Sequence, residues 1–127
     1  MAKRYALIFG VMYGVVALLE IIFREPFGGL LHFSLVHNAI HWVTVAALLF
    51  AFVKGDTVAS LVAKIIGAVF LLVFILGVAA PAFLSDTLGY PVNWFYNIVH
   101  LVTGIGGLYA GFLEKKSPPP PAIASGI

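Results

Sequence analysis

Four long apolar runs constrain the fold of this chain more than any other feature. Each is about as long as the ~20 residues that an α-helix needs to cross the ~30 Å hydrocarbon core of a bilayer. They cover roughly residues 5–23, 36–53, 58–80 and 92–113. None alternates strictly between apolar and polar residues, and each is too long for a membrane-spanning β-strand. We therefore predict an all-α, polytopic membrane protein with four transmembrane helices.

The composition supports this class of protein and excludes others. Of the 127 residues, 62% are hydrophobic and 9% are charged, whereas a soluble domain of this size exposes far more charge. The absence of cysteine excludes disulfides, thiol catalysis and cysteine metal sites. The net charge of +2 is too small and too dispersed for nucleic-acid binding. Because no hydrolase, kinase or dinucleotide motif is present, we expect that the protein is not an enzyme. Its expected partner is the lipid bilayer.

The lysines and arginines predict the orientation of the spans. In a four-span arrangement Arg24 falls on one side of the membrane. The other basic residues fall on the opposite side: Lys3, Arg4, Lys54, Lys64, Lys115 and Lys116. By the positive-inside rule both termini are then cytoplasmic, and we expect the bacterial inner (plasma) membrane. Residues 1–116 would form the transmembrane domain, and the proline-rich residues 117–127 a disordered cytoplasmic tail.

A polar motif occurs twice in this apolar chain. HNAIHWVT at residues 37–44 aligns with YNIVHLVT at residues 96–103. The alignment pairs Asn38 with Asn97, His41 with His100, and Thr44 with Thr103. Helices over the first and third runs align more loosely. We interpret the chain as two tandem helical hairpins, with repeat halves at about 5–53 and 58–113 that insert the same way up.

The spacing of the motif predicts which way its side chains face. At about 100° per residue, the polar side chains of each copy share an arc of about 120°. In the second copy the same arc contains Gly104, Gly107 and Gly111. Small residues in membrane helices mark close helix packing. We therefore expect both polar stripes to face the interior of the bundle.

One interpretation of the stripes is structural. Asn and Thr side chains form hydrogen bonds between membrane helices. The residues that would serve this role are Asn38, Thr44, Asn97 and Thr103. Under this leading interpretation the protein is a structural or interaction protein, such as an accessory subunit of a larger membrane complex or a small homo-oligomer.

The alternative interpretation is a ligand site. His41 and His100, related by the repeat, could be the axial ligands of a haem or a chlorophyll. A divalent metal ion or a proton could instead be held by Glu20, His37, His41 and His100, because Glu20 is the only acid inside an expected span. Both versions remain open from the sequence.

Two simpler explanations apply to individual residues. Glu20 and Arg24 are four residues apart, and an ion pair between them would account for the glutamate. Trp42, Tyr90, Trp94 and Tyr96 fall near the outer ends of the expected spans, as an interfacial aromatic belt does.

The stretch LGYPVNWFYNIVHLVTGIGGLYAG, residues 88–111, resembles a bacterial family of small four-helix membrane proteins classed as a domain of unknown function. The hallmark is an apolar loop ending near V-N, followed by N-x-x-H-x-x-x-G at the start of a helix. It corresponds here to Val92-Asn93, Asn97, His100 and Gly104. The first copy departs from this pattern, because Val45 replaces the glycine. The resemblance implies a four-helix fold and no particular activity.

Overall fold

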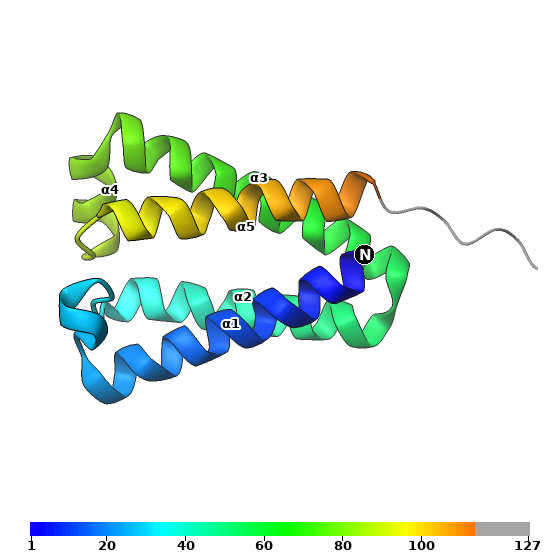
Figure 1. Ribbon diagram of the computed structural model, residues 1–127, viewed down its shortest axis with the longest axis horizontal. Helices are drawn as coiled ribbons and strands as arrows, with labels where there is room; N and C mark the ends of the chain where they lie inside the picture. The colour runs from blue at the N-terminus through cyan, green and yellow to red at the C-terminus, as the bar shows by residue number, and fades with distance from the viewer. Residues whose placement is uncertain (114–127) are drawn as a thin grey trace, which may run out of the picture.

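Five α-helices and one short 3-10 helix make up residues 1–113, the part of the chain that the computed structural model describes. They are α1 (Ala2–Phe23), the 3-10 helix η1 (Pro26–Gly29), α2 (Leu35–Lys54), α3 (Asp56–Ala79), α4 (Pro81–Leu88) and α5 (Trp94–Phe112) (Figure 1). The predicted all-α class is confirmed. Lys115, Lys116 and residues 117–127 lie outside the described residues, so the disordered tail stays a prediction.

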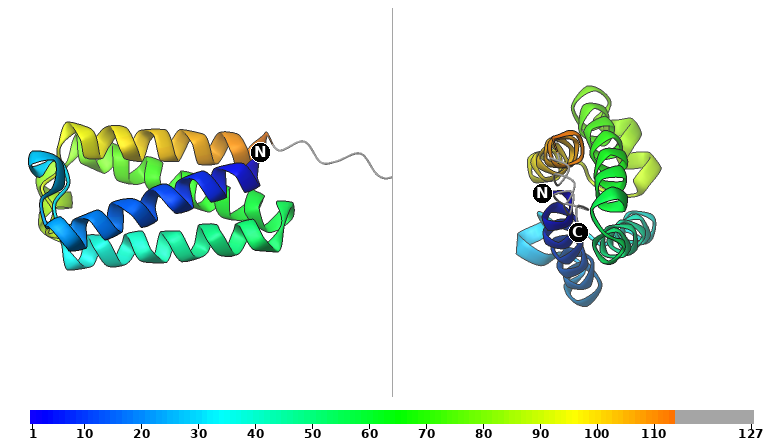
Figure 2. Two further views of the ribbon diagram at one scale, coloured as in Figure 1. Left: turned by 60° about the horizontal axis from the view of Figure 1, so that its bottom comes forward. Right: turned by 90° about the vertical axis from the view of Figure 1, so that its right-hand side faces the viewer.

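The four long helices run side by side (Figures 1 and 2). The closest packing is between α3 and α5 and between α1 and α2, and further contacts of α1 with α3 and α5, and of α2 with α3, join the pairs. The tight turn at Gly55 lies at one end of the molecule, together with the N-terminus, and η1 and α4 lie at the other. We call these the turn end and the loop end.

Three of the long helices, α1, α2 and α3, are long and apolar enough to cross a membrane. α5, with 19 residues, has a comparable length but is not among these three. The surface agrees with lipid contact, because large apolar side chains such as Leu35 and Val53 are exposed, whereas the polar side chains of the stripes are buried except for the half-buried Asn97. This distribution is the reverse of that in a soluble protein.

The segment after α3 differs from the expectation. The third apolar run was expected to end at about residue 80, and Pro81, the next residue, is the first residue of a further helix, α4. Proline is favoured at the first position of a helix, where its missing N–H is not needed, so the same residue can end one helix and begin the next. Gly89 then ends α4 with a left-handed φ of 60°.

The packing of α3 against α5 depends on glycine. A Cβ atom at Gly67 would lie 2.5 Å from the backbone nitrogen of Leu108 and 2.9 Å from the carbonyl oxygen of Gly104. A Cβ atom at Gly107 would lie 2.7 Å from the carbonyl oxygen of Ala63. The two backbones are therefore in direct contact, which confirms that the glycine-rich arc of α5 is a packing face.

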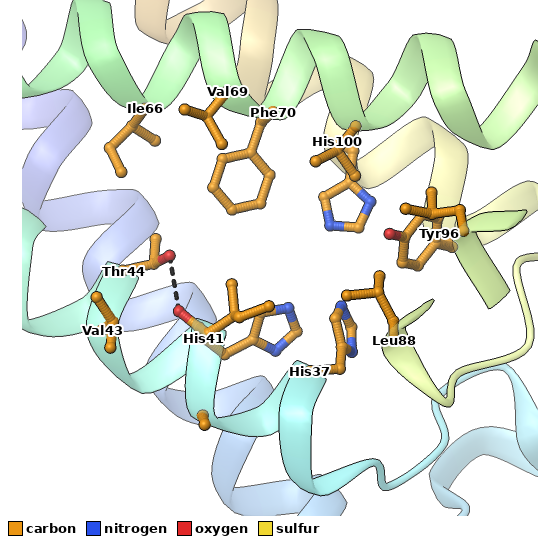
Figure 3. Close-up of a pocket in the computed structure, with 14 residues that line it drawn as sticks. His37, His41, Val43, Thr44, Ile66, Val69, Phe70, Leu88, Tyr96 and His100 are labelled. Atoms are coloured by element: carbon orange, nitrogen blue, oxygen red, sulfur yellow. Dashed lines mark hydrogen bonds between the residues drawn. The ribbon is translucent and has the colours of Figure 1, made fainter. Parts of the chain in front are cut away.

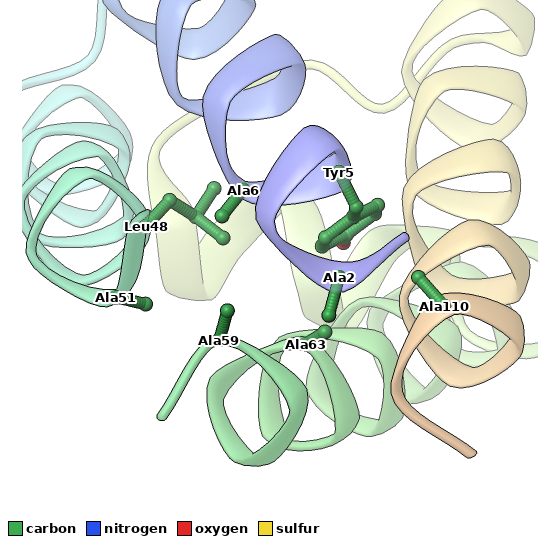
Figure 4. Packing of buried hydrophobic residues seen from close by; sticks show 8 residues of the cluster. All are labelled: Ala2, Tyr5, Ala6, Leu48, Ala51, Ala59, Ala63 and Ala110. Atoms are coloured by element: carbon green, nitrogen blue, oxygen red, sulfur yellow. The ribbon is translucent and has the colours of Figure 1, made fainter. Parts of the chain in front are cut away.

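Small side chains also fill the core at the turn end, where four helices meet (Figure 4). The buried members are Ala2, Tyr5, Ala6, Leu48, Ala51, Ala59, Ala63 and Ala110. Alanine allows the helix axes to approach closely, so this end is compact while the helices diverge toward the loop end (Figure 1).

Two capping residues fasten the segments of the loop end to each other. Asn93 caps α5 by accepting a hydrogen bond from the Tyr96 N–H (2.8 Å), which confirms the expected start of this helix, and it donates to the Leu30 carbonyl (3.1 Å). Ser34 caps α2, and its hydroxyl donates to the Leu88 carbonyl. At α3, by contrast, Gly55 occupies the cap position and has no side chain to accept such a bond.

Candidate metal centre

Three buried histidines converge in the half of the molecule near the loop end (Figure 3). His37 and His41 are four residues apart and so share one face of α2, and His100 reaches the same point from α5. Each offers a ring nitrogen, and these nitrogens lie within 4.8 Å of one another. We call these three residues the histidine cluster.

Aromatic rings hold the cluster in place. The His37 ring lies 4.1 Å from that of His41, measured between ring centroids, and the His100 ring lies 4.0 Å from that of Tyr96. Phe70 of α3 stacks on His100 at 5.1 Å, and Tyr13 of α1 lies 5.0 Å from His41. Four long helices therefore position the three imidazoles by packing.

Several polar atoms at the centre lack a hydrogen-bond partner among residues 1–113. They include both ring nitrogens of His41, the Nδ1 atoms of His37 and His100, and the Tyr96 hydroxyl. Leaving a buried polar group unpaired costs about 1–3 kcal/mol, and nearly all such groups in folded proteins are paired. The cluster therefore calls for an explanation other than helix packing.

Glu20 lies beside the cluster and is fully buried. Its Oε2 atom is 3.9 Å from Nδ1 of His41 and accepts a hydrogen bond from the Asn38 amide (3.2 Å). The expected pairing with Arg24 is wrong, since that guanidinium lies over the Phe33 ring at 4.3 Å. The carboxylate is instead directed toward the histidines.

The other polar residues of the stripes do find partners. Asn38 donates to the Ala17 carbonyl of α1 (3.1 Å), and Asn97 donates to the Gly77 carbonyl of α3 (3.4 Å). Thr103 of α5 shares a hydrogen bond with the Tyr13 hydroxyl of α1 (2.8 Å). These three bonds join different helices. Thr44 differs, because its hydroxyl donates within α2, to the Ile40 carbonyl (Figure 3).

Two cavities meet at the histidine cluster. The larger has a volume of about 420 Å³ and lies toward α2, α3 and α4. The smaller has a volume of about 130 Å³, lies toward α1 and α5, and is also lined by Glu20 and Tyr13. All three histidines and Tyr96 line both cavities. The cluster is thus a wall between two mainly apolar spaces.

Residues 24–113 match the protein family described as a domain of unknown function, DUF4383. The chain belongs to the DUF4383 family. The predicted resemblance to a family of unknown function is thereby confirmed. The matched residues include the three members of the histidine cluster and begin after Glu20. No curated protein and no solved structure matches the chain.

Two tyrosines of this DUF4383 domain have a different role from the one predicted. Tyr90 and Tyr96 were assigned to an interfacial belt, but they are buried, at 2% and 3% exposure, while Trp94 is 63% exposed as expected. Burial raises the pKa of Tyr90 to about 12, so this residue stays protonated and donates to the Leu30 carbonyl. The position of Tyr96, four residues before His100 on the predicted inward arc, was the signal that favoured burial.

The bond between Tyr13 and Thr103 gives a first test of how the DUF4383 helices are held together. Thr103→Val should lower the free energy of unfolding by about 1 kcal/mol, because it leaves the buried Tyr13 hydroxyl without this partner. Tyr13→Phe should cost less, because the Thr103 hydroxyl also donates to the Val99 carbonyl (2.7 Å). The double variant should lose less than the sum, with a coupling of about 0.6–1.7 kcal/mol. Unfolding by dodecyl sulfate in mixed micelles, followed by circular dichroism, measures these values. Strict additivity would mean that the bond contributes nothing.

Proposed function

We propose that this protein is an integral membrane protein that binds one divalent transition-metal ion through His37, His41 and His100. The observation that carries the proposal is the convergence of imidazole nitrogens that have no partner within the described residues. A metal ion would bind one nitrogen of each of the three rings, which hydrogen bonds between helices do not satisfy.

The donor set indicates the class of ion. Imidazole suits zinc, copper, iron and nickel, and the chain has no thiolate to offer. Metal–nitrogen bonds of about 2.0–2.1 Å in a tetrahedral site bring the nitrogens to about 3.4 Å from one another. Small rotations of the three rings from their present spacing would reach that value. Glu20 is placed to orient His41 or to add a carboxylate ligand.

The haem and chlorophyll alternative has less support. Two axial imidazoles would have to lie on opposite faces of a flat macrocycle. The nitrogens of all three histidines lie within 4.8 Å of one another, so His37 would occupy space that a macrocycle between His41 and His100 needs.

The structural interpretation applies to different residues. The hydrogen bonds of Asn38, Asn97 and Thr103 between helices support a role in holding the bundle together. Thr44 faces the larger cavity and bonds only within its own helix. We infer that the polar stripes contain both a framework and the metal site that it supports.

The proposal includes four transmembrane helices arranged as two tandem hairpins in a bacterial inner membrane. The packing of α5 along α3, like that of α1 along α2, supports a fourth span. Lys3, Arg4 and Lys54 lie in the segments at the turn end, which supports a cytoplasmic location for this end. The histidine cluster would then lie in the outer half of the bilayer.

Metal content tests the proposal directly. The full chain, purified in detergent without a polyhistidine tag and dialysed against zinc, should retain about one ion per chain. Replacing all three cluster histidines with alanine should lower the affinity more than about 100-fold, because the ligands themselves are lost. Cobalt(II) should give the visible absorption of a low-coordinate site in the wild type alone.

The fourth histidine provides the matched control. His32 lies between η1 and α2, where its Nδ1 atom is 3.0 Å from Glu25, and His32→Ala should bind metal like the wild type. Helicity measured by circular dichroism shows that each variant is folded. Equal metal retention by the wild type and the triple variant would refute the proposal, and a Soret band would favour the macrocycle.

A further inference from the structure

The larger cavity opens sideways, in the direction of the surrounding lipid. Its lining includes Ala39 and Val43 of α2 and Val69 of α3, which are all exposed. Val43 is 70% and Val69 is 50% exposed, and both belong to the apolar surface that would face the acyl chains. A molecule dissolved in the bilayer could therefore enter between α2 and α3 without crossing water.

Hydrogen-bonding side chains form the inner end of this mainly apolar cavity. Tyr96 and the three histidines line it, and their unpaired polar atoms described above are buried behind its surface. The rings of Phe70 and His100 are stacked at an angle of 22° and form a flat wall beside these groups (Figure 3). The cavity thus combines a wide apolar body with side chains at one end that could turn a hydrogen-bonding group toward a bound molecule, which is the usual design of a small-molecule site.

We propose that this cavity binds a lipid-soluble quinone. The ring carbonyls would accept hydrogen bonds from the Tyr96 hydroxyl and from an imidazole N–H, and the ring would lie against Phe70. The isoprenoid tail would leave between Val43 and Val69. The volume of about 420 Å³ is within the range of about 300–1,000 Å³ that is typical of ligand pockets.

The charge of the lining selects against other membrane lipids. No lysine or arginine is among the described residues that line the cavity, so the carboxylate of a fatty acid or a phosphate head group would be buried without a counter-charge. A long-chain alcohol would satisfy the polar end but would leave the flat aromatic wall without a complementary surface. A neutral, flat head group with hydrogen-bond acceptors fits all three features.

This inference goes beyond the proposed metal site and does not depend on it, because Tyr96, Phe70 and the side opening would act with or without an ion. A short-tailed benzoquinone is the probe, and equilibrium dialysis against the full chain in lipid nanodiscs measures its binding. The wild type should bind it saturably, at about one molecule per chain. An alkyl alcohol or a fatty acid with the same chain length should not displace it.

Two variants locate the binding. Ala39→Phe places a ring in the opening and should lower the affinity at least tenfold. The matched control is Ala46→Phe, which lies two turns further along the same exposed face of α2 and outside the cavity, and it should bind like the wild type. Tyr96→Phe should lower the affinity about five- to tenfold through the loss of one hydrogen bond.

The outcomes separate this inference from the metal proposal. Unchanged affinity in Ala39→Phe, equal competition by the alcohol or the fatty acid, or no saturable binding would each overturn the quinone site. Zinc retention in Ala39→Phe, measured on the same samples, should equal that of the wild type. A protein that binds the quinone and no zinc would refute the metal site alone, and one that binds zinc and no quinone would refute the quinone site alone.

Discussion

Replacing Gly67 with alanine should lower the free energy of unfolding by about 3 kcal/mol, at the upper end of the usual cost of overpacking. The new Cβ atom would meet the backbone of α5 at 2.5 Å from the Leu108 nitrogen and 2.9 Å from the Gly104 oxygen. Backbone atoms cannot rotate away, so α3 and α5 would have to separate along their shared face. Unfolding by dodecyl sulfate in mixed micelles provides the measurement.

Gly14 of α1 is the matched control for this substitution. A Cβ atom there would make ordinary contacts of 3.9 Å with the methyl groups of Val45. Because alanine also has a higher helix propensity than glycine, Gly14→Ala should be neutral or stabilising by up to about 1 kcal/mol. Equal effects at the two positions would mean that backbone contact between α3 and α5 is not what fixes their packing.

In the histidine cluster, one substitution should raise the stability of the metal-free protein and weaken its binding of metal. His41→Leu should raise the free energy of unfolding of the metal-free protein by about 1 kcal/mol, because it replaces two unpaired buried nitrogens with an apolar side chain of similar size. The same substitution should lower zinc affinity more than about 100-fold, since a ligand is lost. Such a trade between stability and activity is common at functional sites.

The control for His41 is its neighbour in the same stripe. Asn38 donates to the Ala17 carbonyl and to Glu20, and its own carbonyl accepts from the Trp42 ring N–H (3.0 Å). Asn38→Leu should therefore cost about 2 kcal/mol, because these partners would be left unpaired. If His41→Leu destabilised the metal-free protein as much as Asn38→Leu does, the histidine would be part of the framework and the metal proposal would lose its basis.

Local sequence patterns predicted much of this fold. Apolar runs of sufficient length predicted the long helices, and the hallmark at Val92-Asn93 predicted the start of α5. The inward direction of the stripes followed from helical periodicity alone. α4 was missed because Pro81 signals the end of a helix and the beginning of one equally well, and only packing of Leu84 against Tyr90 and Tyr96 decides between them.

The sequence predicted which residues form the candidate site, but not which hydrogen bonds they make. The spacing of His37, His41 and His100 indicated that they face inward, and the depth of Glu20 in the sequence indicated that it could reach them. Which atoms remain unpaired depends on contacts between helices, such as the hydrogen bond from Asn38 to the Ala17 carbonyl of α1. Thr44 and Thr103 have identical places in the repeat and each donates within its own helix, yet only Thr103 also bonds to another helix, because Tyr13 lies on one side of the bundle alone.

The bond from the Ser34 hydroxyl to the Leu88 carbonyl has a consequence for access to the larger cavity. The peptide chain joins α2 to α3 at Gly55, and this bond joins the start of α2 to the end of α4. Together they form a closed frame around the gap between α2 and α3. A window framed in this way widens less readily than an open hinge, because the Ser34 bond must break first. Rotation of side chains such as Val43 and Val69 is then the easier route of passage. It should discriminate by the thickness of a guest and not by the length of its tail.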